Sequence, residues 1–176
     1  MAKSDENRVP AGLYTAQQRM RRDASVWTLV QGVLAPVQFI IFLISVVLVV
    51  RYLLTGEGYG VATWSILIKT AALALIMVTG AIWEKVVFGQ YLFAPAFFWE
   101  DVFSFAVIAL HAAYVWALWT GYMTPVELMF LALAAYTAYV INAVQFILKL
   151  RAARLQAAAE TSPQSHGLDA RQEAPA

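Results

Sequence analysis

Three carboxylate residues bracket one aromatic segment near the middle of the chain: Glu84 opens it, and Glu100 and Asp101 close it. Partial removal from water favours the protonated form of a carboxyl group, which can then act as a general acid near neutral pH. A second carboxylate beside it could activate water or stabilise a developing cation. We therefore take Glu84, Glu100 and Asp101 as candidate catalytic residues. The alternative is that they are interfacial residues that pair with Lys85 and nearby arginines.

The segment between these carboxylates, EKVVFGQYLFAPAFFWED over 84–101, is rich in aromatic side chains. A simple loop between membrane spans needs turn formers, a few polar residues and little else. Flat aromatic surface bounded by carboxylates suits a flat apolar ligand with one reactive edge. The candidate stacking residues are Tyr91, Phe97, Phe98 and Trp99. An aromatic belt at the membrane interface is the alternative interpretation of the same residues.

Long apolar runs flank this segment on both sides and must position it. The chain has 176 residues, of which 61% are hydrophobic and 13% charged, so a soluble domain could not keep its apolar surface from water. The runs are long enough to cross a bilayer. The sequence therefore predicts an all-α integral membrane protein, a four-helix bundle. Its spans are expected at about Trp27–Leu54, Val61–Trp83, Asp101 or Val102 to Thr120, and Val126–Leu148.

Basic residues predict the orientation of these spans. Lysines and arginines gather in the arm over 1–26 and again between Lys149 and Arg154, whereas the loops near Thr55 and Thr124 have almost none. The positive-inside rule then places both termini in the cytoplasm, and segment 84–101 at the cytoplasmic interface. We expect a basic arm over 1–26 with a short surface helix at 15–23, and a membrane domain over 27–155. The last span is expected to continue as a helix through LKLRAARLQAAAE. The tail over 156–176 is expected to be disordered.

The composition excludes several classes of function. A net charge of +1 gives no basic field for nucleic acid. The absence of cysteine excludes disulfides, thiolate metal sites, iron–sulfur clusters and cysteine nucleophiles. No nucleotide-binding motif is present either, so we expect no cofactor.

Each predicted span carries one stripe of polar residues, because the spacings of three, four and seven place them on one helix face. The stripes are Gln31, Gln38 and Ser45; Lys69, Gly80 and Glu84; Glu100, Ser104 and His111; and Tyr139, Asn142, Gln145 and Lys149. Four inward-facing stripes would line a cavity, and we take Gln38, Asn142 and Gln145 as candidate substrate-binding residues. The alternative is that amides and hydroxyls only join helices.

His111 is the only histidine within a predicted span. A buried imidazole can bind a metal, hold a proton or hydrogen-bond a neighbour. Without a second histidine in the membrane, a bis-histidine haem site is not expected. Two functional roles stay open for His111: ligand to the magnesium of a chlorophyll-type ring, and member of a proton relay.

Three segments resemble the bacterial chlorophyllide 3-vinyl hydratases of bacteriochlorophyll biosynthesis. They are RRDASVWTLVQGVLAPVQF at 21–39, VTGAIWEKVVFGQYLFAPAFFWEDVFS at 78–104 and YVINAVQFILKLRAARL at 139–155. The resemblance implies addition of water across the 3-vinyl group of chlorophyllide a to give a 1-hydroxyethyl group. It implies a magnesium tetrapyrrole substrate and a multi-pass protein of the bacterial inner, intracytoplasmic membrane. Other pigment-synthesis enzymes or a second copy of the chain are candidate partners beside the bilayer.

A non-enzymatic pigment carrier, or an assembly factor for photosynthetic membrane complexes, is the main alternative. It would use the same aromatic surface and His111 but would not need paired carboxylates. A transporter is less consistent with the sequence, because no span has an acidic residue at mid-depth and the halves are not repeats. A haem-binding anchor subunit of a respiratory enzyme would require the missing histidine pair.

Overall fold

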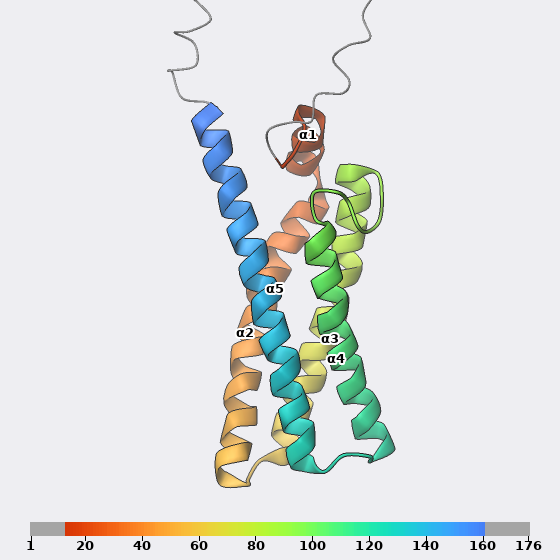
Figure 1. Ribbon diagram of the computed structural model, residues 1–176, viewed down its shortest axis with the longest axis vertical. Coiled ribbons are helices and arrows are strands. Elements are labelled where there is room, and N and C mark those ends of the chain that lie inside the picture. Colours follow the sequence, from red (N-terminus) through yellow and green to blue (C-terminus); the bar gives the residue numbers. More distant parts are fainter. Residues whose placement is uncertain (1–12, 161–176) are drawn as a thin grey trace, which may run out of the picture.

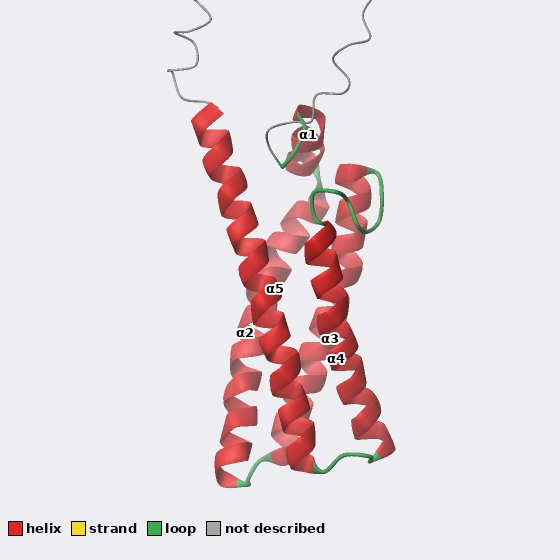
Figure 2. Cartoon of the chain, in the orientation of Figure 1, coloured by secondary structure: helices red, strands yellow, loops and turns green. Residues whose placement is uncertain are grey.

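Four long helices form the body of the protein in the computed structural model, which describes residues 13–160 (Figures 1 and 2). They are α2 (Val26–Thr55), α3 (Tyr59–Phe88), α4 (Phe98–Thr120) and α5 (Pro125–Glu160), preceded by the short α1 (Ala16–Ala24). Each of the four is long and apolar enough to cross a bilayer. The described residues contain no strand, so the prediction of an all-α protein with four spans is confirmed.

The helices pack as two hairpins. α2 packs closely along α3, and α4 along α5, whereas contact between the two pairs is less extensive. The inner faces form one core cluster made by Phe42, Val49, Ala62, Ile66, Tyr114, Ala117, Leu128, Met129, Ala132 and Tyr136. This cluster takes side chains from both hairpins, which therefore share one core.

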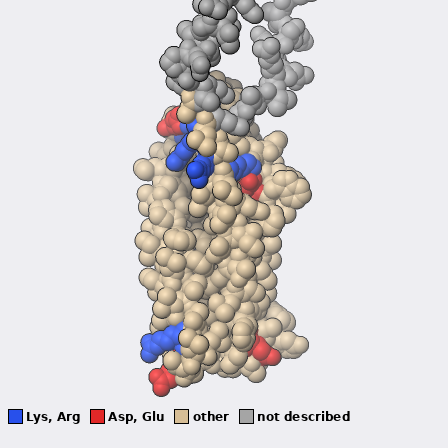
Figure 3. All heavy atoms as spheres, turned by 60° about the vertical axis from the view of Figure 1, so that its left-hand side comes forward, with Lys and Arg blue, Asp and Glu red and all other residues tan. Residues whose placement is uncertain are grey.

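The outer faces of the bundle are apolar and suited to lipid. Large hydrophobic side chains are exposed along every long helix, for example Leu43, Trp64, Phe105 and Ile147. On the face seen in Figure 3, charged side chains gather at the two ends, and the surface between them is uncharged. This is the distribution that a membrane-spanning bundle requires.

The ends of the spans differ from the predicted ones around segment 84–101. α3 was expected to end at Trp83 but continues to Phe88, and Gly89 ends it in the left-handed conformation (φ 86°), where a glycine has no steric penalty. α4 begins at Phe98, before its predicted start. Glu84 and Asp101 therefore lie within helices, and the loop between α3 and α4 is only Gly89–Phe97.

The other expected boundaries agree more closely. α5 begins at Pro125, which suits the first position of a helix. It ends at Glu160, the last residue of the predicted helical extension, so 156–160 of the predicted tail are helical. The disorder expected after that point concerns 161–176, which lie outside the described residues.

Both described ends of the chain lie at the same end of the bundle (Figure 1). α1, the loop Gly89–Phe97 and the last turns of α5 occupy this end, and the two short loops occupy the other. α1 begins with a capping box in which Thr15 and Gln18 bind each other's backbone N–H groups. The short helix expected at 15–23 is confirmed as a helix.

Candidate functional site

Glu84 and Asp101 meet at the end of the bundle that carries α1. The Ala94 N–H donates to Oε2 of Glu84 at 3.2 Å, and the Phe93 N–H donates to Oδ2 of Asp101 at 2.6 Å. Because these two N–H groups belong to adjacent residues, the two carboxyl groups are held close enough to interact electrostatically. Both residues are buried, with exposed fractions of 5% and 8%. Two buried carboxylates this close repel each other, which favours a single shared proton over two negative charges.

The loop conformation makes this arrangement possible. Phe93 has a φ of 59°, the left-handed region, which is rare for a bulky residue. Adjacent N–H groups around such a residue point to one side and form an anion-binding concavity. The side chains of Glu84 and Asp101 fill it, so the loop is fastened to both α3 and α4.

Glu100 lies beside this pair but has a different partner. Its Oε2 accepts a hydrogen bond from Nζ of Lys149 at 2.6 Å, an ion pair that joins α4 to α5. The same Lys149 ammonium lies 5.1 Å from the ring centroid of Phe97. The structure thus brings all three predicted carboxylates to one end of the bundle, as one acid pair and one ion pair.

The predicted stacking residues divide into two groups. Phe97 is 1% exposed, and its ring packs on Trp83, Phe88 and Phe146 at centroid distances of 5.4–5.7 Å. Its faces are therefore covered by protein, contrary to the role expected for it. Exposed rings are instead presented beside the carboxylates by Tyr91, Phe98 and Trp99, and by Phe93, which stacks on Phe105.

α1 and the residue just before it cover the buried aromatic side chains around Phe97. Tyr14, just before α1, is buried against Phe88 and Phe97 at centroid distances of 5.8 and 6.3 Å. Burial raises the pKa of Tyr14, although the Arg22 guanidinium 4.7 Å from its ring opposes this effect. The Tyr14 ring thus covers the buried aromatic residues at this end of the bundle.

His111 lies deeper and apart from the carboxylates. It follows Asp101 by ten residues of α4, which is about 15 Å along the axis. Nδ1 is 2.8 Å from the carbonyl oxygen of Val107, and Nε2 has no hydrogen-bond partner among the described residues. Because a carbonyl only accepts, Nδ1 carries the hydrogen, and the Nε2 lone pair of the neutral ring is free to bind a metal.

Polar residues of α5 lie between the carboxylates at the end of the bundle and the deeper His111. Asn142 donates to Ser104 at 2.8 Å, and the side-chain oxygens of Asn142 and Gln145 are buried without a hydrogen-bond partner in residues 13–160. Gln38 of α2 is buried as well. Other stripe residues join helices, as the alternative interpretation expected: Gln31 donates to Thr79 at 2.8 Å, and Ser45 hydrogen-bonds Ser65 and Tyr136.

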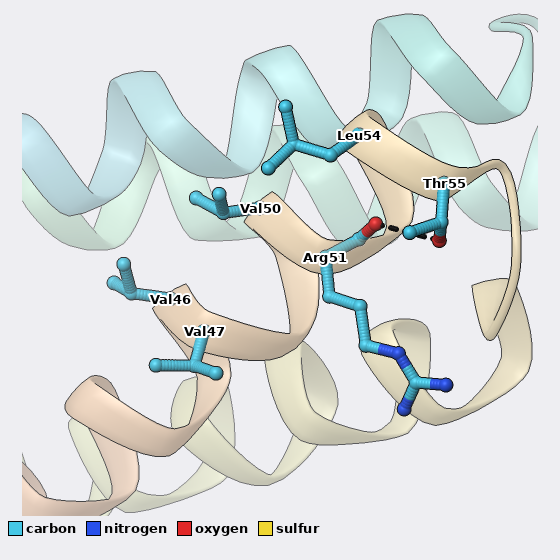
Figure 4. Close-up of a pocket in the computed structure, with 6 residues that line it drawn as sticks. All are labelled: Val46, Val47, Val50, Arg51, Leu54 and Thr55. Carbon is cyan, nitrogen blue, oxygen red and sulfur yellow. Dashed lines mark hydrogen bonds between the residues drawn. The ribbon is translucent and has the colours of Figure 1, made fainter.

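A separate hollow lies elsewhere on the bundle. A shallow groove of about 460 Å³ runs along α2 near the opposite end of the bundle and is lined by Val46, Val47, Val50, Arg51, Leu54 and Thr55 (Figure 4). All its lining residues belong to one helix, and most are apolar, so we interpret it as lipid-facing surface. Within residues 13–160, no three histidine or carboxylate side chains converge as a metal site would require.

Comparison with known proteins gives one consistent result. Residues 14–152 match the family described as 2-vinyl bacteriochlorophyllide hydratase (BCHF). The chain is 68% identical over 160 residues to the 2-vinyl bacteriochlorophyllide hydratase of Rhodobacter capsulatus, covering 91% of this chain and 93% of that protein. It is 71% identical over 143 residues to the protein of the same name from Cereibacter sphaeroides, covering 81% and 89%. No solved structure matches the chain.

Proposed function

This chain belongs to the 2-vinyl bacteriochlorophyllide hydratase family, and we propose that it adds water to the 3-vinyl group of chlorophyllide a or a closely related magnesium tetrapyrrole. The product carries a 1-hydroxyethyl group, and the step belongs to bacteriochlorophyll biosynthesis. The structural observation that carries the mechanism is the close placement of the buried Glu84 and Asp101 carboxyl groups, which accept hydrogen bonds from adjacent loop residues. A pair that shares one proton supplies both a general acid and a general base.

Hydration of the vinyl group needs one proton delivered and one removed. The protonated member of the pair donates its proton to the terminal carbon of the vinyl group, which becomes a methyl group. Positive charge develops on the adjacent carbon and is delocalised into the macrocycle. The ionised member stabilises this charge and accepts a proton from the attacking water. The net change is the addition of one water, and the carboxyl pair returns to its starting state.

The surrounding residues have supporting roles in this proposal. The ion pair between Glu100 and Lys149 joins α4 to α5 beside the carboxyl pair and so helps to position it. The exposed rings of Tyr91, Phe98 and Trp99 receive the flat substrate beside the carboxylates. Deeper in the bundle, His111 binds the substrate's magnesium through Nε2, and Gln38, Asn142 and Gln145 contact the ring.

We further place the protein in the bacterial inner, intracytoplasmic membrane, with both termini in the cytoplasm. Support comes from Arg19, Arg21 and Arg22 in α1 and from the basic residues near the end of α5, which share one end of the bundle. The carboxyl pair then lies near the cytoplasmic surface, where water for the reaction is available. Other pigment-synthesis enzymes or a second copy of the chain are candidate partners there.

The test is incubation of the detergent-purified full chain with chlorophyllide a in oxygen-18 water, followed by mass spectrometry of the pigment. We expect a product heavier by one labelled water, with the label lost on dehydration of the new hydroxyl group. Tight binding of the pigment without any change in mass would contradict hydration and favour a pigment carrier.

A further inference from the structure

Lys69 is a charged residue in the interior of a membrane-spanning bundle. It lies ten residues from the start of α3, and its side chain is completely buried. Nζ lies 3.6 Å from the ring centroid of Tyr139 and has no hydrogen-bond partner within the described part of the chain. An ammonium group has three donors, and all three are left without an acceptor. Ionisable groups placed in this way usually belong to a functional site.

No carboxylate of the described residues is placed to neutralise this charge. The interior carboxylates are at the end of the bundle that carries α1, and Glu84 follows Lys69 by fifteen residues of α3, about 22 Å. The ion pairs in residues 13–160 involve Lys149 and Arg22, not Lys69. His111, with which Lys69 interacts electrostatically, is not an anion. A charged Lys69 therefore calls for an anion that residues 13–160 do not supply.

The substrate of the proposed reaction carries a suitable anion. A chlorophyllide differs from the corresponding chlorophyll in having a free propionate carboxylate where the chlorophyll has a long-chain ester. We propose that Lys69 binds this carboxylate and so selects the free acid over its esters. This inference rests on the proposed function for the identity of the ligand, and on the unpaired, buried ammonium for its place.

The position of Lys69 fits one substrate that reaches both levels of the bundle. On α5, Tyr139 contacts Lys69, and Lys149 contacts Glu100 beside the acid pair. These two α5 residues are ten positions apart, about 15 Å, which is on the order of the length of a tetrapyrrole with its propionate side chain. A substrate with its propionate at Lys69 would extend from there toward the carboxyl pair.

Several buried polar atoms of residues 13–160 have no hydrogen-bond partner and could contact a substrate that extends from Lys69 toward the carboxyl pair. They are Nε2 of His111 on α4 and the side-chain oxygens of Asn142 and Gln145 on α5, while Lys69 itself is on α3. α3 belongs to one hairpin, and α4 and α5 to the other, so these groups come from both hairpins. A ligand that enters between the hairpins would meet all four groups.

The experiment compares chlorophyllide a with its methyl ester, which is nearly the same size but lacks the charge. Both are offered to the purified full-length wild type, to Lys69→Met and to Lys69→Arg, with equilibrium binding measured by pigment absorbance and turnover measured by mass spectrometry. We expect the wild type to bind the free acid about tenfold or more tightly than the ester, because a buried charge-assisted hydrogen bond is lost with the charge. Lys69→Met removes this preference, and Lys69→Arg retains most of it.

Arg51→Met serves as the matched control, because it removes a cation near the end of α2 that lies away from the carboxyl pair. It should leave the preference for the free acid over the ester unchanged. Equal affinity of the wild type for acid and ester would overturn the proposal even if Lys69→Met did not fold. So would a folded Lys69→Met that keeps the preference. If the wild type prefers the free acid but hydrates neither compound, Lys69 is upheld as an anion site and the hydratase assignment fails.

Discussion

Glu84 and Asp101 come from different helices, yet they accept hydrogen bonds from the backbone N–H groups of two adjacent residues, Ala94 and Phe93. The two carboxyl groups also interact electrostatically. The pair therefore fastens the loop between α3 and α4 and, in the proposed mechanism, also supplies the acid and the base. Tests of the chemistry must keep the hydrogen-bond acceptors while they remove the titrating group.

The first prediction concerns Glu84→Gln and Asp101→Asn. Each amide keeps a carbonyl oxygen for the loop N–H but cannot exchange a proton at neutral pH. We expect kcat to fall by about 10²–10⁴-fold in each variant, with the affinity for substrate little changed, because general acid–base catalysis contributes an effect of this size. Initial rates of hydration and pigment binding measure the two quantities separately.

Glu57→Gln is the matched control, since Glu57 is an exposed carboxylate in the loop at the opposite end of the bundle. It should hydrate at the wild-type rate. Near-normal kcat in either Glu84→Gln or Asp101→Asn would remove that residue from the chemistry and leave it only the role of loop anchor.

The second prediction concerns the backbone of Phe93. Phe93→Ala and Phe93→Gly both remove the ring that contacts Phe98 and Phe105. Only glycine adopts a φ of 59° without a steric penalty, so Phe93→Gly should be more stable than Phe93→Ala by about 1 kcal/mol. Unfolding of both variants in mixed detergent measures the difference, and an alanine variant as stable as the glycine variant would contradict it.

The sequence predicts the four spans to within a few residues at most ends, since apolar runs of this length have no other stable fold. It misplaces the end of α3, because Glu84 and Lys85 are charged enough to suggest the end of a span. The helix continues until Gly89, the first residue that favours its termination. The hydrogen bonds that hold the loop to Glu84 and Asp101 could not be predicted, because they depend on a positive φ at Phe93. The usual sequence signal for a positive φ is a glycine or asparagine, and this position has neither.

The aromatic residues show a second limit of the sequence. Phe97, Phe98 and Trp99 are consecutive, so composition alone gives no reason to separate them. The structure does so because Phe97 lies just before α4 and points into the bundle, whereas the next two residues begin the helix on its outer side. The buried residue before the first helical turn has no periodicity from which its direction could be inferred.

The third prediction follows from this separation. Phe97→Ala should destabilise the protein by about 3–5 kcal/mol, because it leaves a cavity among Trp83, Phe88 and Phe146. Trp99→Ala should change stability by less than about 1 kcal/mol, since the side chain is 66% exposed, but should weaken substrate binding. Detergent unfolding and pigment titration on the same samples separate the effects. A large loss of stability in Trp99→Ala would reverse the assignment.

The fourth prediction concerns the ion pair between Glu100 and Lys149. The Glu100 side chain is 9% exposed and that of Lys149 26%, so removal of one partner leaves a poorly solvated charge. We expect Glu100→Gln and Lys149→Met to cost about 1–3 kcal/mol each, which is below the value for a fully buried pair. The double variant should lose less than the sum of the two, and strict additivity would show that the pair contributes no coupling energy.

The last prediction tests His111 with the metal of the substrate. Nε2 of His111 is buried without a hydrogen-bond partner in the described chain, and its orientation is fixed by the bond of Nδ1 to Val107. If Nε2 binds magnesium, the wild type should bind a magnesium-free analogue about tenfold more weakly than the natural pigment, whereas His111→Ala should bind the two alike. Lys69 and the carboxyl pair remain in this variant, so the free-acid preference should persist. A preference for the magnesium pigment in folded His111→Ala would transfer the ligand role to another residue or to water.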